Sequence, residues 1–148
     1  MKRTERARNY LKAIELGATG ERLATFFHPD VKQIEFPNRL VTAGAERDLE
    51  MILEGALKGQ AVLSSQTYEI HRCYESGDTV ILEVTWKGIL AVPMGSLQPG
   101  ETMTARFAVF LDFEGDLIGC IGDILLATDH RSHHVIAIGV YFAGDISK

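Results

Sequence analysis

The sequence predicts an α+β domain in which a curved antiparallel sheet packs against N-terminal helices. Two stretches with apolar residues at helical spacing, 4–16 and 45–58, come early in the chain. Runs that alternate between apolar and polar residues dominate the second half, and a tight turn at 114–116 joins the last two. This order indicates helices on one face of the sheet. A sheet that curls over a long helix is expected to enclose a cone-shaped cavity, and we predict that a ligand binds there.

The first helix is expected over residues 4–16, because Ala7, Leu11 and Ile14 fall on one apolar stripe. Its polar side carries the only basic cluster of the chain, which we expect to face solvent. The cluster consists of Lys2, Arg3, Arg6 and Arg8.

The segment that follows should contain a short second helix, a strand and a long helix. Pro29 is expected to end the short helix, since its ring disfavours helix at the preceding residue. The strand is expected over residues 31–36. The long helix is expected over residues 45–58, where Gly59 supplies a stop. Its apolar face consists of Leu49, Ile52, Leu53, Ala56 and Leu57.

Four strands complete the predicted fold. They are expected over residues 62–74, 78–91, 103–113 and 117–124. The second of these alternates strictly, which is typical of an antiparallel sheet with one buried face. Its buried set is Val80, Leu82, Val84 and Trp86.

Composition indicates a soluble globular domain of 148 residues, with 46% hydrophobic and 24% charged residues. No apolar run approaches the roughly 20 residues that span a bilayer, so no membrane contact is expected. The basic N-terminus lacks the apolar stretch of a signal peptide, which favours a cytoplasmic location. A net charge of −5 argues against nucleic acid as a partner.

Several short motifs, in order, resemble the nuclear transport factor 2-like superfamily. They are Asn-Tyr-Leu at 9–11, Phe-Phe-His-Pro-Asp-Val at 26–31, Ile-Glu-Phe-Pro at 34–37, Thr-Trp-Lys-Gly at 85–88, Pro-Gly at 99–100 and Phe-Glu-Gly-Asp-Leu-Ile at 113–118. The chain is most similar to the SnoaL-like branch, which includes polyketide cyclases, beside the ketosteroid isomerases and limonene epoxide hydrolases. The resemblance implies a single SnoaL-like domain over residues 1–148 with an atypical tail at about 127–148.

The resemblance implies two catalytic candidates. Tyr10 falls where ketosteroid isomerases place the tyrosine that donates a hydrogen bond to the substrate oxyanion. Asp123 lies one position after the acidic residue of related cyclases and hydrolases. If Gly122 forms a bulge, Asp123 turns into the cavity as an acid or base. If the strand is regular, it faces away.

The proton-abstracting carboxylate of the isomerases aligns with Phe36, and their second acid aligns near Val109. The neighbouring Glu35 should point to the opposite face of its strand, because successive strand side chains alternate. The arginine and aspartate pair of the epoxide hydrolases has no evident equivalent. Ketosteroid isomerisation by the isomerase mechanism is therefore not expected.

Apolar side chains are expected to line the cavity and to bind an apolar small molecule. The candidates are Trp86, Val84, Phe107, Val109, Phe36, Phe27 and Cys120. Neither a cofactor nor a metal is expected, because His130, His133 and His134 fit a solvated tail better than a zinc site. His28 and His71 fit structural and surface roles better than catalysis.

The apolar run at 135–142 could add an edge strand, cover the cavity or contact a partner. The resemblance implies a homodimer. The prediction for function is therefore a small-molecule-binding protein that acts as an isomerase, cyclase or hydrolase by acid–base chemistry. The alternative is a non-catalytic ligand-binding or dimerisation module of the same fold.

Overall fold

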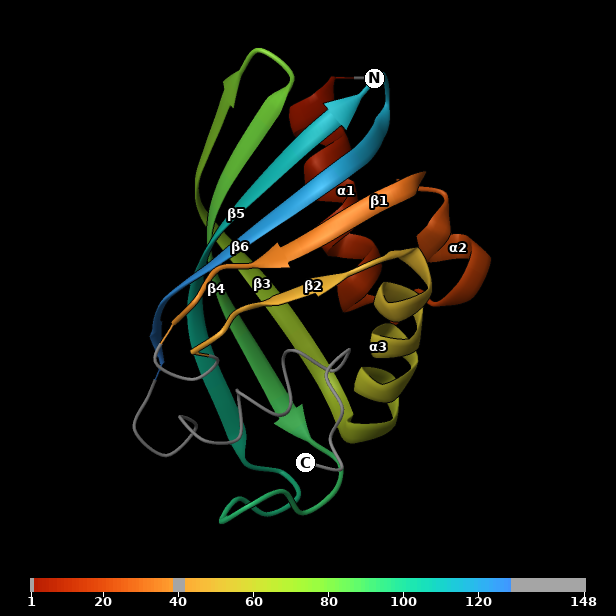
Figure 1. The fold of residues 1–148 in the computed structure, drawn as a ribbon. Coiled ribbons are helices and arrows are strands. Elements are labelled where there is room, and N and C mark those ends of the chain that lie inside the picture. Colours follow the sequence, from red (N-terminus) through yellow and green to blue (C-terminus); the bar gives the residue numbers. More distant parts are fainter. Residues whose placement is uncertain (1, 39–41, 129–148) are drawn as a thin grey trace.

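The computed structural model describes residues 2–38 and 42–128. Six strands form one curved sheet in the order β2-β1-β6-β5-β4-β3, with three helices against it (Figure 1). The helices contact β3 and β1, which lie toward opposite edges of the sheet, so the sheet bends around them. The predicted α+β class and helix-covered sheet are confirmed.

The elements follow the predicted order, with one added strand, β2. The helices are α1 (Arg3–Glu15), α2 (Gly20–Ala24) and α3 (Leu49–Val62). The strands are β1 (Phe27–Glu35), β2 (Ala45–Arg47), β3 (Leu63–Ser76), β4 (Thr79–Leu90), β5 (Thr102–Glu114) and β6 (Leu117–Thr128). Gly77 and Gly115 have φ of +57° and +63°, which lets the β3–β4 and β5–β6 hairpins turn tightly. No helix in the described part of the chain is long and apolar enough to cross a membrane.

Several predicted boundaries are wrong. Pro29 lies within β1 rather than ending a helix, and the register between β1 and β6 shifts around it. A proline is tolerated there because the ladder is already irregular. Residues 45–47 form β2, and α3 begins only after Asp48, whose side chain accepts a hydrogen bond from the Met51 N–H at 3.0 Å.

The helix α3 also continues past Gly59 to Val62. Gly59 is buried and does not adopt the positive φ that would end a helix. The helix ends instead where Leu63 takes extended geometry and starts β3.

One strand pair of the sheet is parallel. β1 runs parallel to β6, whereas its other neighbour, β2, is antiparallel. The connection from β1 to β6 includes most of the domain, which is long enough for a parallel pairing. This pairing places residues from the start of the chain beside the last described strand.

The concave face of the sheet and the helices share one hydrophobic core. Trp86, Leu82 and Leu111 are at most 1% exposed on this face. The predicted alternation of β4 is confirmed, because Val80, Leu82, Val84 and Trp86 are all buried.

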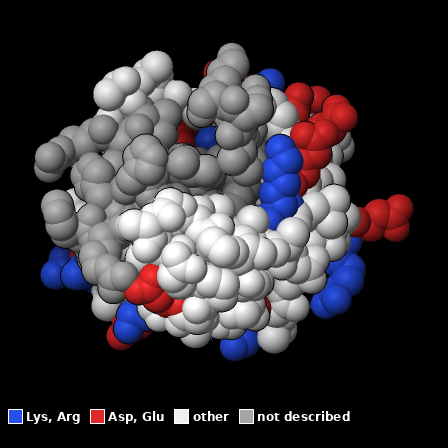
Figure 2. Space-filling model, turned by 90° about the horizontal axis from the view of Figure 1, so that it is seen from below, with Lys and Arg blue, Asp and Glu red and all other residues white. Residues whose placement is uncertain are grey.

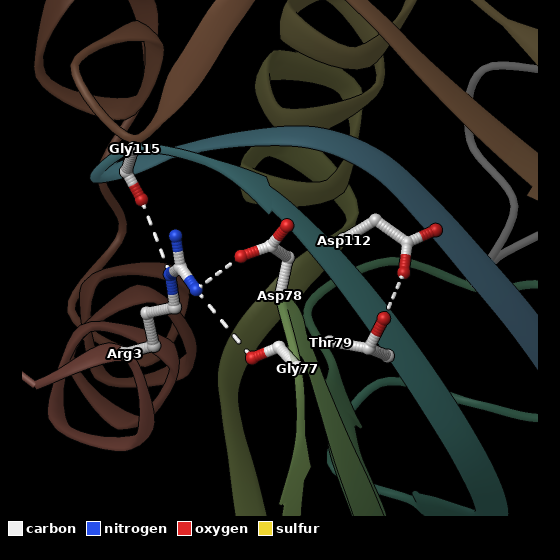
Figure 3. A network of polar contacts seen from close by, with 6 residues as sticks. All are labelled: Arg3, Gly77, Asp78, Thr79, Asp112 and Gly115. Carbon is white, nitrogen blue, oxygen red and sulfur yellow. Dashed lines mark hydrogen bonds and ion pairs between the residues drawn. The ribbon is translucent and has the colours of Figure 1, made fainter.

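Arginine side chains of α1 bind the turns of the β3–β4 and β5–β6 hairpins at one end of the sheet (Figure 3). Arg3 Nη1 lies 2.6 Å from Asp78 Oδ1, and Arg3 Nε donates to the Gly115 carbonyl at 3.3 Å. Arg6 donates to the Thr25 carbonyl at 2.7 Å and lies 4.4 Å from the centre of the Phe26 ring. Two members of the basic cluster are therefore structural contacts rather than a solvated surface, because their donors satisfy turn carbonyls.

Candidate active site on the concave face of the sheet

A bulge in β6 decides where Asp123 points. Ile118 pairs with Phe113 and Cys120 with Asp112, so Gly119 is one extra residue against β5. The extra residue reverses the alternation that follows it. Asp123 is consequently opposite Val109 on the concave face. Of the two alternatives predicted for Asp123, the inward direction holds, but the bulge that produces it is at Gly119 rather than at Gly122.

Asp123 lies in a row of side chains that crosses five strands on the concave face. Register pairs connect Cys73 of β3 to Leu82, Val109, Asp123 and Glu35 of β1. Directly paired residues share a face in a sheet. The carboxyl group therefore stands at the boundary between an apolar wall and a polar corner.

The Asp123 side chain is buried and its Oδ2 accepts a hydrogen bond from Gln33 Nε2 at 2.7 Å. Burial raises its pKa from 3.8 to about 6, and the charge of Glu35 adds to the rise. The Gln33 hydrogen bond and the charge of Arg47 oppose it. A carboxyl group with such a pKa can both accept and return a proton near neutral pH.

Glu35 and Arg47 form a buried ion pair beside Asp123. Glu35 Oε1 and Arg47 Nη2 are 3.3 Å apart, and the two side chains are 0% and 4% exposed. Asn38 Nδ2 donates to Glu35 Oε2 at 3.1 Å. Burial raises the pKa of Glu35, whereas Asn38 and Arg47 lower it.

The prediction for Glu35 and Phe36 is wrong. Glu35 faces the concave side, and Phe36, expected to line the cavity, is 45% exposed just beyond the end of β1. Phe36 lies so near Gly122 that a Cβ there would be 3.2 Å from its ring. The expectation that the two side chains point to opposite faces is correct, but the faces are exchanged: Phe36, which aligns with the inward carboxylate of the isomerases, lies on the convex side.

Two tyrosines lie close to Asp123. Burial raises the pKa of Tyr10 well above 10, and Tyr68 and the Asp123 charge raise it further. Burial raises the pKa of Tyr68 too, with Asp123 and then Glu15 adding to the rise. Both phenols keep their protons at neutral pH and can only donate or accept hydrogen bonds. Tyr10 also packs edge-on against Phe27, with ring centres 5.5 Å apart.

Most of the expected apolar lining residues lie on the concave face near this row. Val84 and Phe107 are a register pair one row from Asp123, and Trp86 is in the row beyond. Trp86 Nε1 donates to Gln66 Oε1 at 3.0 Å. Cys120 is a second exception besides Phe36. It pairs with the exposed Asp112 on the convex face, so it does not join the lining.

Sequence reasoning did not predict roles for Gln33, Arg47 and Tyr68. The sequence pattern around Arg47 predicts a helix, so neither the strand β2 nor the inward direction of the Arg47 side chain could be predicted. The position of Gln33 could have been predicted together with that of Glu35. Gln33 lies two residues before Glu35, and residues two apart on a strand point to the same face.

The histidines with described positions do not reach this cluster. His28 Nδ1 accepts the Asp30 N–H, and its Nε2 lies 3.4 Å from Glu114. His71 is exposed and its Nε2 is 2.6 Å from Thr85 Oγ1. Among the described residues, no three His, Cys, Asp or Glu side chains gather as metal ligands. His130, His133, His134 and the apolar run at 135–142 lie outside the described residues.

A separate pocket of about 230 Å³ opens between the ends of α1 and α3 and the start of β3. Its walls include Glu15, Gln60 and Gln66, and Asp123 is not among them. Figure 2 shows the end of the molecule that carries the β4–β5 loop, where uncharged residues fill the centre of the described surface and charged side chains lie around it. Residues 91–100 of that loop contain no Lys, Arg, Asp or Glu.

The fold is shared with several solved structures. The candidate polyketide cyclase IdmH from Streptomyces antibioticus superposes with a TM-score of 0.73 at 17% identity, covering 94% of this chain and 99% of that chain. A SnoaL-like polyketide cyclase from Agrobacterium tumefaciens has a TM-score of 0.65 at 16% identity, with 85% and 92% covered. A Catenulispora acidiphila protein with a ketosteroid isomerase-like fold, solved with trimethylamine, has a TM-score of 0.59 at 21% identity, with 80% and 83% covered.

Such identities show the fold alone. No curated protein matches the sequence. A family model for the SnoaL-like domain, however, matches residues 7–119, which is most of the chain. With the helix-backed curved sheet, this match identifies the chain as a member of the SnoaL-like domain family.

Proposed function

We propose that the concave face binds a neutral, largely apolar small molecule and that Asp123 transfers a proton on it. The observation that carries this proposal is the buried Asp123 carboxyl, whose pKa of about 6 suits proton transfer near neutral pH. Apolar side chains adjoin it on one side, including Val109 and Phe107. Phenols that retain their protons lie nearby as hydrogen-bond donors.

The charges of the cluster favour a neutral ligand. Arg47 is already paired with Glu35, so it offers little attraction to a carboxylate or phosphate. The partly ionised Asp123 adds negative charge, which disfavours anions further. A ketone or enol within a mostly apolar skeleton fits this arrangement. The fold neighbours described as polyketide cyclases support the same substrate class.

The proposed step is proton abstraction next to a carbonyl. The Asp123 carboxylate takes a proton from the carbon beside the carbonyl, and the electron pair moves onto the carbonyl oxygen as an enolate. The phenol of Tyr10 donates a hydrogen bond to that oxygen. Return of the proton from Asp123 to another carbon completes an isomerisation. In a cyclisation the enolate carbon attacks a second carbonyl carbon, whose π bond breaks, and the new alkoxide oxygen takes the proton from Asp123.

The test uses 2-tetralone, a neutral apolar ketone, in D₂O. We expect the protein to accelerate deuterium incorporation beside the carbonyl, as followed by ¹H NMR, and Asp123→Asn to remove the acceleration. Tyr10→Phe should slow exchange about 10²-fold or more if it is the oxyanion donor. Equal exchange rates with the native protein and Asp123→Asn would sink the catalytic proposal.

Ligand binding without catalysis is the alternative, and Trp86 separates it from the first proposal. Trp86 is the single tryptophan of the chain and is 1% exposed on the concave face. A change in its fluorescence on adding 2-tetralone, without deuterium exchange, would favour the binding module.

We also propose that the convex face pairs two copies of the chain. Phe36 is 45% exposed, and the half-buried Phe110 and Ile124 lie on the same face. An apolar sheet face of this kind is a common isologous contact. Phe110→Glu should convert a dimer to a monomer in analytical ultracentrifugation, whereas a monomeric native protein would contradict the proposal.

A further inference from the structure

Arg47 shares the polar corner with two carboxyl groups, those of Glu35 and Asp123. Glu35 and Asp123 are register partners on the adjacent strands β1 and β6. The guanidinium pairs with Glu35 at 3.3 Å, and its charge is also felt at Asp123. Asn38 holds the second oxygen of Glu35 at 3.1 Å. The partner observed for Asp123, in contrast, is the neutral amide of Gln33 at 2.7 Å.

A neutral partner and a cationic partner have different consequences for a buried carboxyl group. An arginine at salt-bridge distance favours the ionised form of a carboxyl group, because protonation would leave the guanidinium charge uncompensated. A glutamine donates to one carboxyl oxygen and leaves the other able to carry a proton. The carboxyl group that lacks the arginine is therefore the one that exchanges its proton more readily.

We propose that Glu35 is a positioning residue that holds the Arg47 guanidinium on the β1–β2 side and so keeps Asp123 free to exchange its proton. Asn38 assists by fixing the Glu35 carboxylate. The inference rests on the proposed function, because it assigns a regulator to the proton-transfer residue. It concerns the ionisation of Asp123, which can be measured without any substrate.

Glu35 and Arg47 are the groups best placed to exert this control. Tyr10 of α1 and Tyr68 of β3 also face Asp123, but both are neutral at the pH values concerned. Cys120 is on the convex face of the same strand, and burial raises the pKa of its thiol, so it too is neutral. The two fixed charges that face Asp123 are therefore of opposite sign and come from β1 and β2.

The experiment is an NMR titration of the ¹³C-labelled Asp123 carboxyl in four proteins: native, Glu35→Gln, Arg47→Met and the double variant. Asp123→Asn identifies the resonance. We expect Glu35→Gln to lower the titration midpoint by about one pH unit or more, a tenfold change in proton affinity. Arg47→Met should raise the midpoint.

The double variant decides between positioning and simple charge repulsion. If Glu35 positions Arg47, Glu35→Gln has a much smaller effect in the Arg47→Met background, because no guanidinium remains to move. Equal shifts in the two backgrounds would mean that both charges act on Asp123 independently, and the proposal would be overturned.

A milder variant keeps the proposal testable if Glu35→Gln does not fold. Asn38→Ala removes one hydrogen bond from Glu35 and should lower the Asp123 midpoint in the same direction by less. An unchanged midpoint would count against the proposal. Deuterium exchange with 2-tetralone reports separately on catalysis, so a coupled titration without exchange would leave this inference standing while the proposed function fails.

Discussion

Two arginine–carboxylate pairs stabilise different parts of this domain. The pair with the shorter N–O distance is exposed, and the pair with the longer distance is buried. Arg3 and Asp78 are 2.6 Å apart, but their side chains are 27% and 74% exposed. Arg47 and Glu35 are 3.3 Å apart and almost fully buried. Water and salt screen the first pair, whereas a broken second pair leaves a charge inside the protein. Burial, rather than distance, therefore decides which pair the fold depends on.

The largest effect is expected from breaking the buried pair. Glu35→Gln should lower the free energy of unfolding by about 3–5 kcal/mol, because the charge of Arg47 loses its carboxylate in a dry environment. Urea unfolding followed by Trp86 fluorescence measures it. The double variant Glu35→Gln with Arg47→Met should recover part of the loss. A loss no greater than that of Asp78→Asn would show that the buried pair contributes no more to stability than the exposed pair.

The next largest effect is expected from Asp123. Its contribution to stability changes with pH in the direction opposite to that of a salt-bridged acid. Its pKa is raised on folding, so the folded protein binds more protons than the unfolded chain between about pH 4 and 6. Stability from this group is fully present below the unfolded pKa and is lost as pH rises through about 6. The pKa difference corresponds to about 2–3 kcal/mol.

Asp123→Asn tests that sign. It should remove this part of the pH dependence and leave the protein more stable than the native chain at pH 7.5, by up to about 2 kcal/mol. Stability curves from urea unfolding at several pH values between 4 and 8 measure both quantities. A native protein whose stability rises through the same window, with the rise lost in Asp123→Asn, would contradict the raised pKa.

The contrast between the two pairs also shows what the sequence could predict. The order of elements and the buried face of β4 followed from periodicity and turn residues, which depend on local geometry. The strand β2 did not, because residues 45–47 continue smoothly into a helical pattern. The parallel pairing of β1 with β6 was also missed, since it joins segments far apart in sequence.

Register explains the errors at the site. One extra residue at Gly119 decides that Asp123 faces the concave side, and a glycine in a strand signals a bulge without fixing its position. The apolar Phe36 was assigned inward and Glu35 outward, whereas a buried arginine makes the reverse arrangement stable. A buried charge cannot be predicted without its partner, and Arg47 lies on a different strand.

Within the Arg3–Arg6 region, Arg6 should matter more than Arg3. It lies over the Phe26 ring and donates to the carbonyls of Thr25 and Asp116. Arg6→Met keeps much of the aliphatic stem, so the expected loss of about 1–2 kcal/mol reports on the carbonyl bonds and the cation–π contact. Arg6→Lys should recover only part of it, since ammonium lacks the planar fork. Full recovery would mean that charge alone is sufficient.

The smallest effect is expected from Asp78→Asn, although it breaks the shorter of the two ion pairs. The loss should be below about 0.5 kcal/mol, because Asp78 is mostly exposed and the pair is already screened. Arg3 also keeps its bonds to the Gly77 and Gly115 carbonyls, which fasten the helix without any carboxylate (Figure 3). Unfolding at 0.05 M and 1 M NaCl measures the loss, which should shrink toward zero at 1 M because salt screens an exposed pair. A loss comparable to that of Glu35→Gln would show that distance outweighs burial here, and the buried pair would then lose its special place in the fold.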